Sequence, residues 1–213
     1  MTEDHSILFK VCGMRDTENI SDVATLMPDF MGFIFYKKSP RYVGENFHVP
    51  LNFPSAIKRV GVFVNENIEV IKFLVEKHNL DYVQLHGEES IADCNKLKKF
   101  GVGVVKVFSV GEDFDFKITI PYESVVDYFL FDTKGKFYGG NAVAFDWNLL
   151  SRYNQKIPFF LSGGLTESNI SMIKNLSGYN LAGVDFNSGV EVSPGLKNIQ
   201  KINSVLKLIT INN

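Results

Sequence analysis

The sequence is poor in cysteine and has no long apolar run. Only two cysteines occur among its 213 residues, Cys12 and Cys94, and they lie far apart. Neither a disulfide framework nor a zinc site is therefore indicated. No stretch approaches the roughly 18 consecutive apolar residues that a membrane-spanning helix needs. The first residues, MTEDHSILFK, carry acidic side chains where a secretory signal needs basic ones. We therefore expect a cytoplasmic protein that binds no membrane.

The chain has no marked excess of basic or acidic residues, and it also lacks the common nucleotide-binding motifs. The 22 basic and 24 acidic residues give a net charge of -2, so the chain as a whole has no electrostatic reason to bind nucleic acid. Any anionic ligand must be held by local groups. No strand opens into a G-x-G-x-x-G turn, and no P-loop is present. With 213 residues and 45% hydrophobic content, we expect one buried core and a single domain spanning residues 1–213.

Short apolar runs recur along the chain, and adjacent runs start roughly 20 to 30 residues apart, which is the spacing of βα units. The predicted strands are Ile7–Cys12, Met31–Phe35, Val60–Val64, Tyr82–Leu85, Val102–Val107, Tyr128–Phe131, Ile157–Leu161 and Leu181–Asp185. Helical periodicity predicts helices over 67–77, 168–176 and 197–209. The pattern over 111–125 does not distinguish one helix from two short segments.

Eight such units in a chain of this length favour an α/β fold of the (β/α)₈ TIM-barrel type. An open doubly wound sheet is the alternative, and the missing dinucleotide motif makes it less attractive. In a barrel, the carboxyl ends of all the strands meet at one mouth. The residues that follow predicted strands are Cys12, Arg41, His86, Asp132, Gly163–Gly164 and Asp185–Gly189.

Asp132 follows the apolar run 128–131 in LFDTKG, just before a loop that contains Gly139 and Gly140. Burial at such a place favours the protonated carboxyl group, which is the form that a general acid needs. The alternative is an aspartate that caps a turn.

Three other strand-end residues have competing interpretations. Cys12 ends the first strand in KVCGM, before a candidate helix cap near Asp16 or Thr17. It is either a reactive thiol, favoured as thiolate by a nearby positive charge such as Lys10, or buried filler. Arg41 lies in the proline-containing segment KKSPRYV and suits a substrate carboxylate, or is a solvated loop charge. His86 in VQLHG is more typical of a satisfied strand-end histidine than of a catalyst.

Glycine-rich segments after the last two strands indicate a phosphate site. LSGGLTESNI offers Gly163 and Gly164 before a predicted helix, and VDFNSGVEVSPG offers Ser188 and Gly189. Backbone N–H groups and a helix N-terminus favour anions, and barrels commonly bind phosphate at these two loops. The chain can in this way hold a phosphorylated substrate despite its slightly acidic balance.

Seven segments together resemble the phosphoribosylanthranilate isomerases of tryptophan biosynthesis, in order from residue 10 to residue 197. They are KVCG, GFIFYKKSPRYV, VGVFVN, VQLHGEE, FDTKG with GG, FLSGGL and VDFNSGVEVSPGLK. The resemblance implies a (β/α)₈ barrel that performs an Amadori rearrangement without a cofactor or metal. The implied substrate is a small phosphorylated aminosugar, N-(5-phosphoribosyl)anthranilate, and the implied product is 1-(2-carboxyphenylamino)-1-deoxyribulose 5-phosphate.

The resemblance also implies residue roles. Asp132 would be the general acid that protonates the ring oxygen, and Cys12 the general base that removes the proton from C2, for which its pKa must fall from about 8.5. Arg41 would lie near the anthranilate carboxylate. Gly163, Gly164, Ser188 and Gly189 would bind the phosphate. Asp185 and His86 are candidate substrate contacts.

One segment departs from the family, because Asn141 and Ala142 follow Gly140 where Thr-Gly is usual. Ala142 adopts a positive φ less readily than glycine, so closure of this loop is expected to differ. Two other functions remain open: a non-catalytic phosphosugar-binding barrel, and isomerisation of a histidine-pathway aminoaldose. Related isomerases of that pathway have a carboxylate where Cys12 stands, which favours the anthranilate substrate. A monomer and a homodimer are both compatible with the sequence.

Overall fold

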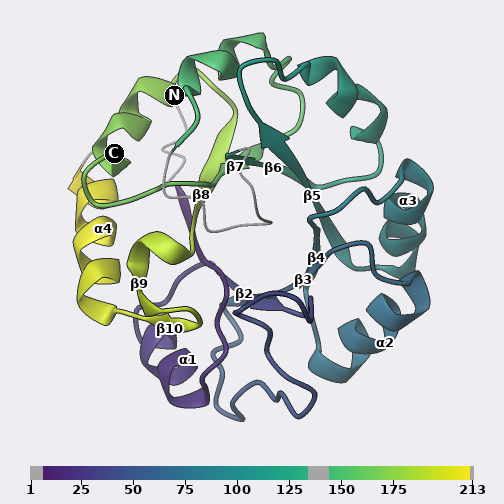
Figure 1. Ribbon diagram of the computed structural model, residues 1–213, viewed down its shortest axis with the longest axis vertical. Coiled ribbons are helices and arrows are strands. Elements are labelled where there is room, and N and C mark those ends of the chain that lie inside the picture. Colours follow the sequence, from purple (N-terminus) through teal and green to yellow (C-terminus); the bar gives the residue numbers. More distant parts are fainter. Residues whose placement is uncertain (1–6, 134–143, 212–213) are drawn as a thin grey trace.

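The computed structural model describes residues 7–133 and 144–211, and these residues form one closed barrel of eight parallel strands. The strands are β1 (Leu8–Val11), β2 (Phe30–Ile34), β3 (Lys58–Phe63), β4 (Tyr82–Leu85), β5 (Gly103–Val110), β6 (Tyr128–Thr133), β7 (Phe159–Leu161) and β8 (Leu181–Phe186). Strand β1 pairs with β2 on one side and with β8 on the other, which closes the ring (Figure 1). The predicted (β/α)₈ barrel is confirmed, and each predicted strand overlaps one strand of the ring.

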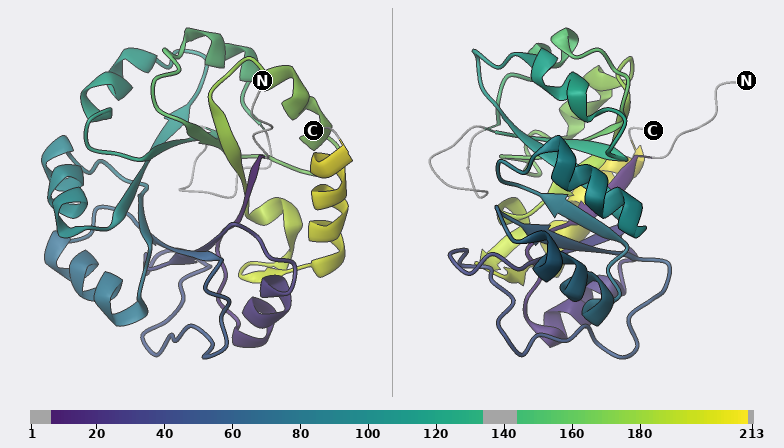
Figure 2. Two further views of the ribbon diagram at one scale, coloured as in Figure 1. Left: turned by 180° about the vertical axis from the view of Figure 1, so that it is seen from behind. Right: turned by 90° about the vertical axis from the view of Figure 1, so that its right-hand side faces the viewer.

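Helices surround the barrel, as the two opposite views along its axis show (Figures 1 and 2). The α-helices are α1 (Thr17–Ala24), α2 (Ile68–His78), α3 (Ile91–Phe100) and α4 (Ile199–Ile211). The 3-10 segments are η1 (Phe116–Tyr122), η2 (Trp147–Arg152), η3 (Ile170–Leu176) and η4 (Ser188–Val190). A short antiparallel hairpin, β9 (Glu191–Ser193) and β10 (Leu196–Lys197), lies between β8 and α4. Residues 1–6, 134–143 and 212–213 lie outside the described ranges, so the domain limits 1–213 stay a prediction.

The predicted helices over 67–77 and 197–209 correspond to α2 and α4, whereas the one predicted over 168–176 is the 3-10 segment η3. The N-cap residue of η3, Asn169, makes no side-chain bond to the first turn. Its amide instead binds the loop before it, accepting from the N–H of Thr166 at 2.9 Å and donating to the carbonyl of Gly164 at 2.8 Å. The ambiguous segment 111–125 contains η1, where Pro121 removes a backbone donor and disfavours an α-helix.

For α1 the sequence analysis indicated only a cap near Asp16 or Thr17, and α3 was not predicted, although both helices have clear N-cap signals. Asp16 accepts from the N–H of Asn19, and Ser90 forms a reciprocal capping box with Asp93. By contrast, residues 35–57 contain no helix, and a long irregular connection joins β2 to β3 between α1 and α2 (Figure 1). Arg41 lies in this connection.

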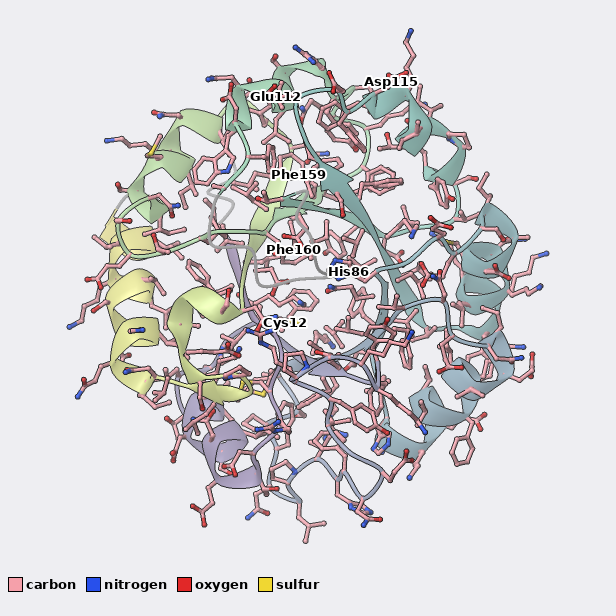
Figure 3. All side chains as sticks on the ribbon, viewed as in Figure 1. Cys12, His86, Glu112, Asp115, Phe159 and Phe160 are labelled. Carbon is pink, nitrogen blue, oxygen red and sulfur yellow. The ribbon has the colours of Figure 1, made fainter. Side chains whose placement is uncertain are left out.

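The core has two parts, separated by the barrel wall. The larger part lies between strands and helices, and Phe159 belongs to it, whereas its neighbour Phe160 points into the barrel (Figure 3). Inside, Phe160 packs against Phe30 with ring centroids 5.2 Å apart. Closer to the carboxyl ends of the strands, Cys12 packs with Ile34 and Val62. Side chains therefore fill the barrel interior up to the level of Cys12, Ile34 and Val62, and these three side chains form the floor of the site.

Candidate active site

A cavity at the carboxyl ends of the strands contains every catalytic, phosphate-binding and substrate-contact residue that the resemblance implies. It is lined by Cys12, Ile34, Tyr36, Ser39, Arg41, Val62, Val64, Gln84, His86, Asp132, Ser162, Gly163, Gly164, Leu165, Asp185, Asn187, Ser188 and Gly189. Cys12 and His86 lie near the middle of the barrel mouth, whereas Glu112 and Asp115 lie at the outer rim (Figure 3). Barrel closure thus places residues from both ends of the chain in one site.

Asp132 lies on β6 and is only 4% exposed. Its Oδ1 accepts a hydrogen bond from the N–H of Thr133 at 2.9 Å. Its Oδ2 lies 3.4 Å from Nε2 of His86, which follows β4 and which donates its own backbone N–H to the carbonyl of Phe63 at 2.9 Å. His86 is therefore both a satisfied strand-end residue and a direct neighbour of the proposed acid.

Cys12 directly follows β1 and is 3% exposed. Its N–H donates to the carbonyl of Phe186 at 2.8 Å, which fixes the thiol at the β1–β8 junction. A Cβ atom on the neighbouring Gly32 would lie 2.7 Å from the Cys12 sulfur, so the thiol fits there because β2 has a glycine at this point. Burial raises the pKa of the Cys12 thiol, and the ammonium group of Lys10 opposes that rise. The prediction that this pKa falls is therefore wrong for the protein as described, because the cost of burial exceeds the attraction of Lys10.

Lys10 and Asp185 form a buried ion pair next to Cys12. The two residues are register partners across β1 and β8, and Nζ of Lys10 lies 2.8 Å from Oδ1 of Asp185. Burial lowers the pKa of Lys10, but Asp185 and Cys12 outweigh that effect and leave this pKa raised. Lys10 is thus a fixed positive charge, two residues from the thiol on the same face of the strand.

Arg41 is buried and already has a carboxylate partner within the protein. Its Nε donates to Oε1 of Glu191 at 2.9 Å and its Nη2 to Oε2 at 2.7 Å, a bidentate contact. Glu191 also accepts from Nζ of Lys197 at 2.7 Å and from the N–H of Gly195 at 3.0 Å. The alternative of a solvated loop charge is therefore wrong, because the Arg41 residue is only 8% exposed.

The two glycine-rich loops meet at the edge of the cavity. Gly163 and Gly164 have φ values of 83° and 66°, which favour glycine, and no protein acceptor is recorded for either N–H in the described ranges. A Cβ atom on Gly189 would lie 2.0 Å from the carbonyl oxygen of Leu165, so the loops after β7 and β8 touch. Segment η4 starts at Ser188, with only Asn187 between it and the end of β8, whereas η3 starts only at Ile170. The geometry can accept an anion, mainly through backbone N–H groups.

Within residues 7–133 and 144–211, no group of three or more histidine, cysteine, aspartate or glutamate side chains is placed to hold a metal ion. In the same ranges, none of the helices has the length and apolar character needed to cross a bilayer. Gly139, Gly140, Asn141 and Ala142 lie outside the described residues, so the expected change in loop closure stays a prediction.

Comparison with known proteins identifies the family. A sequence model described as N-(5'-phosphoribosyl)anthranilate isomerase matches residues 9–208. The chain belongs to this family. The N-(5'-phosphoribosyl)anthranilate isomerase of Parabacteroides distasonis is 43% identical over 206 residues, which cover 95% of this chain and 93% of the relative.

Solved structures of the family share the fold. The phosphoribosyl anthranilate isomerase of Thermotoga maritima is 31% identical and superposes with a TM-score of 0.82, covering 96% of this chain and 98% of that one. Another structure, 30% identical with a TM-score of 0.78 and the same coverage, is the isomerase in complex with reduced 1-(o-carboxyphenylamino)-1-deoxyribulose 5-phosphate. The predictions of an isomerase enzyme and of this family are confirmed.

Several residues of this family member's site were missed by the sequence analysis. Lys10 was expected as a nearby positive charge for the Cys12 thiol, but its ion pair with Asp185 was not predicted. Glu191 and Lys197 lie in the segment VEVSPGLK, but their partners come from distant parts of the chain. Asn169 was read only as part of a helix start, whereas it fixes the loop of Gly164.

Proposed function

We propose that this protein converts N-(5'-phosphoribosyl)anthranilate to 1-(2-carboxyphenylamino)-1-deoxyribulose 5-phosphate by an Amadori rearrangement, in the biosynthesis of tryptophan. The observation that carries the proposal is the cavity that brings a buried carboxyl group, Asp132, and a buried thiol, Cys12, together with two glycine-rich loops. Family membership supports the same reaction, and a relative binds a reduced form of the product.

The substrate would be held by its two anionic ends. Its phosphate would accept hydrogen bonds from the loops of Gly163, Gly164, Ser188 and Gly189, which lie side by side at the cavity edge. Its anthranilate carboxylate would lie at Arg41, another residue of the same cavity. The sugar would then lie between these anchors, over the floor that contains Cys12.

In the first step, Asp132 would donate its proton to the ring oxygen of the sugar. The bond between C1 and this oxygen breaks, and the lone pair of the anthranilate nitrogen forms the C=N bond of a protonated Schiff base. The short distance between Asp132 and His86 supports this role, because a neighbouring imidazole can orient the carboxyl group. Asp132 would end this step as a carboxylate.

In the second step, the Cys12 thiolate would remove the proton from C2. The electron pair of that C–H bond forms a C1=C2 double bond, and the nitrogen regains its lone pair. The enaminol would then return its hydroxyl proton to the Asp132 carboxylate and receive the proton of the Cys12 thiol at C1, which gives the aminoketose and restores both groups. The Schiff base is positively charged and adjacent to the thiol, so it adds to the attraction of Lys10 and favours the thiolate when it is needed.

Substitution of the two groups tests this function. Cys12→Ser and Asp132→Asn should each lower kcat by roughly 100-fold or more, because general acid and general base catalysis are each worth about that much. Binding of the reduced product should remain, since neither group anchors phosphate or carboxylate. Equal and small losses in both variants would contradict the assignment. A protein that binds the reduced product but turns over no substrate would instead be a non-catalytic phosphosugar-binding barrel.

Three broader properties belong to the same proposal. The reaction as drawn needs no cofactor, since every proton and electron pair moves between substrate and side chains. We further propose a cytoplasmic location and a monomeric or homodimeric state.

A further inference from the structure

A buried cluster of three charged side chains lies behind the proposed carboxylate site. Glu191 is at its centre, between the guanidinium group of Arg41 and the ammonium group of Lys197. All three side chains are 10% exposed or less. The cluster links the long β2–β3 connection to the segment after β8, 150 residues further along the chain.

The geometry divides the guanidinium group into two edges. The edge formed by Nε and Nη2 is occupied by the two oxygens of Glu191. Nη1 has no recorded acceptor among the described residues, so the edge formed by Nη1 and Nη2 keeps donors for another carboxylate. Arg41 is also a lining residue of the cavity. Because the fork is planar and rigid, fixing one edge also fixes the direction of the other.

Lys197 connects the same cluster to the phosphate loops. Its Nζ donates to Oδ1 of Asn187 at 2.8 Å and to the carbonyl of Asn187 at 3.2 Å. Asn187 directly precedes Ser188, one of the proposed phosphate-binding residues, and lines the cavity. A single carboxylate, Glu191, therefore holds both the arginine and the lysine that steadies the neighbouring loop.

We infer that Glu191 is a positioning residue, which orients Arg41 so that its second edge faces the carboxylate of the substrate. This inference rests on the proposed function, in which Arg41 receives the anthranilate carboxylate. Without Glu191 the guanidinium would keep its charge but lose its fixed direction. The Arg41 side chain would then have to become ordered when the substrate binds, which would lower the affinity for the substrate about tenfold.

Charge alone does not explain the arrangement. Glu191 reduces the net positive charge near Arg41, so a purely electrostatic receptor would be stronger without it. Burial lowers the pKa of Lys197 to about 8 even with Glu191 raising it. When the charge of Glu191 is removed, Lys197 is expected to lose its proton near neutral pH, which keeps the net charge of the cluster close to its original value. A loss of affinity in such a variant therefore reports orientation.

The test compares two ligands that differ only in the carboxylate. The first is reduced 1-(o-carboxyphenylamino)-1-deoxyribulose 5-phosphate, and the second has a plain phenylamino group. Wild-type protein should prefer the first by at least about tenfold, the worth of a charge-assisted contact. In Glu191→Gln this preference should fall about tenfold, whereas any loosening of the phosphate loop through Lys197 would weaken both ligands by the same factor. In an Arg41→Met background, Glu191→Gln should change the preference no further.

Two control variants separate positioning from folding. Glu123→Gln removes a carboxylate that also binds a lysine, Lys156 at 2.8 Å, but that is not part of the cavity, and it should leave both affinities unchanged. Glu191→Asp keeps the charge with a shorter reach and should retain part of the preference, which provides a second variant if Glu191→Gln unfolds.

Three outcomes would overturn the inference. An undiminished preference in Glu191→Gln would show that Arg41 needs no such support. Equal losses for both ligands would show a structural role only. If wild-type protein itself had no preference, Arg41 would not bind the carboxylate, and that part of the proposed function would fail together with the inference.

Discussion

At the scale of single residues, the protonation of Cys12 depends on Lys10. Burial raises the pKa of the thiol, and Lys10 is the nearest positive charge that opposes this rise. Lys10→Met removes that attraction, so the pKa of Cys12 should rise further and the acid limb of the kcat/KM profile should move to higher pH. Lys10→Met alone leaves the Asp185 carboxylate unpaired, and the double variant Lys10→Met with Asp185→Asn removes that carboxylate. In the double variant the acid limb should still lie at higher pH than in the wild type.

The measurement is the pH dependence of kcat/KM together with the pH dependence of Cys12 alkylation. Alkylation reports the thiolate without the rest of the mechanism. Lys156→Met, which removes an exposed ion pair, is the matched control and should leave both profiles unchanged. Unchanged profiles in the Lys10 variants would show that Lys10 acts only on the fold.

A separate prediction concerns the effect of Lys197 on the pH dependence of stability. Its pKa is about 8 in the folded protein and near 10.5 when unfolded, so the unfolded chain binds more protons between these values. The contribution of Lys197 to stability should therefore increase as the pH rises from 8 to 10, by about 2 kcal/mol. Urea unfolding gives the free energy of unfolding of the wild type and of Lys197→Met at pH 8 and at pH 10. The difference between the two proteins should change by this amount between the two pH values. A difference that stays constant would contradict the shifted pKa.

At the scale of elements, the loop after β7 needs glycine at residue 163. Gly163 has a φ of 83°, and a Cβ atom there would lie 2.5 Å from Oδ1 of Asp132 and from the N–H nitrogen of Thr133. Gly163→Ala should lower both stability and kcat, because the loop and the catalytic carboxyl group cannot keep their places together. Gly101→Ala is the matched control, since Gly101 has a φ of 95° but no atom within 4 Å of the added Cβ.

Gly101→Ala should therefore lose stability alone. Comparison of melting temperature and kcat for the two variants separates backbone strain from the clash with Asp132. If Gly163→Ala lost stability but kept full kcat, the close approach of residue 163 to Asp132 would not affect catalysis.

Elements with a strong local pattern were predictable, and those decided by tertiary contacts were not. All eight strands were found because strands covered on both sides are continuously apolar. Helix η3 was predicted as an ordinary helix because its periodicity is helical, but Asn169 uses its side chain to hold the preceding loop. The absence of a helix over residues 35–57 has no simple local signal, and the contact of Arg41 with Glu191 joins this segment to a residue 150 positions away.

At the scale of the whole molecule, closure of the barrel creates the site. The topology predicted that residues at strand ends would meet, and the structure places Cys12, His86, Asp132 and Asp185 in one cavity. The predicted topology did not indicate which charged side chains would pair, because Lys10 pairs with Asp185 across the β1–β8 junction and Arg41 pairs with a residue 150 positions away. A chain with a net charge of -2 thus gathers Lys10, Arg41 and Lys197 at one end of its barrel.

This distribution of charge leads to a prediction about substrate choice. The cavity offers one thiol as base and one arginine with a free edge for a carboxylate, a combination suited to the anthranilate substrate. Assayed side by side, the anthranilate substrate should exceed a histidine-pathway aminoaldose in kcat/KM by at least about 100-fold, since the latter lacks the anthranilate carboxylate that would bind the second edge of Arg41. Arg41→Met should narrow this ratio mainly through KM of the anthranilate substrate, with kcat much less affected. Comparable kcat/KM values for both substrates in wild type would show that neither Cys12 nor Arg41 determines specificity.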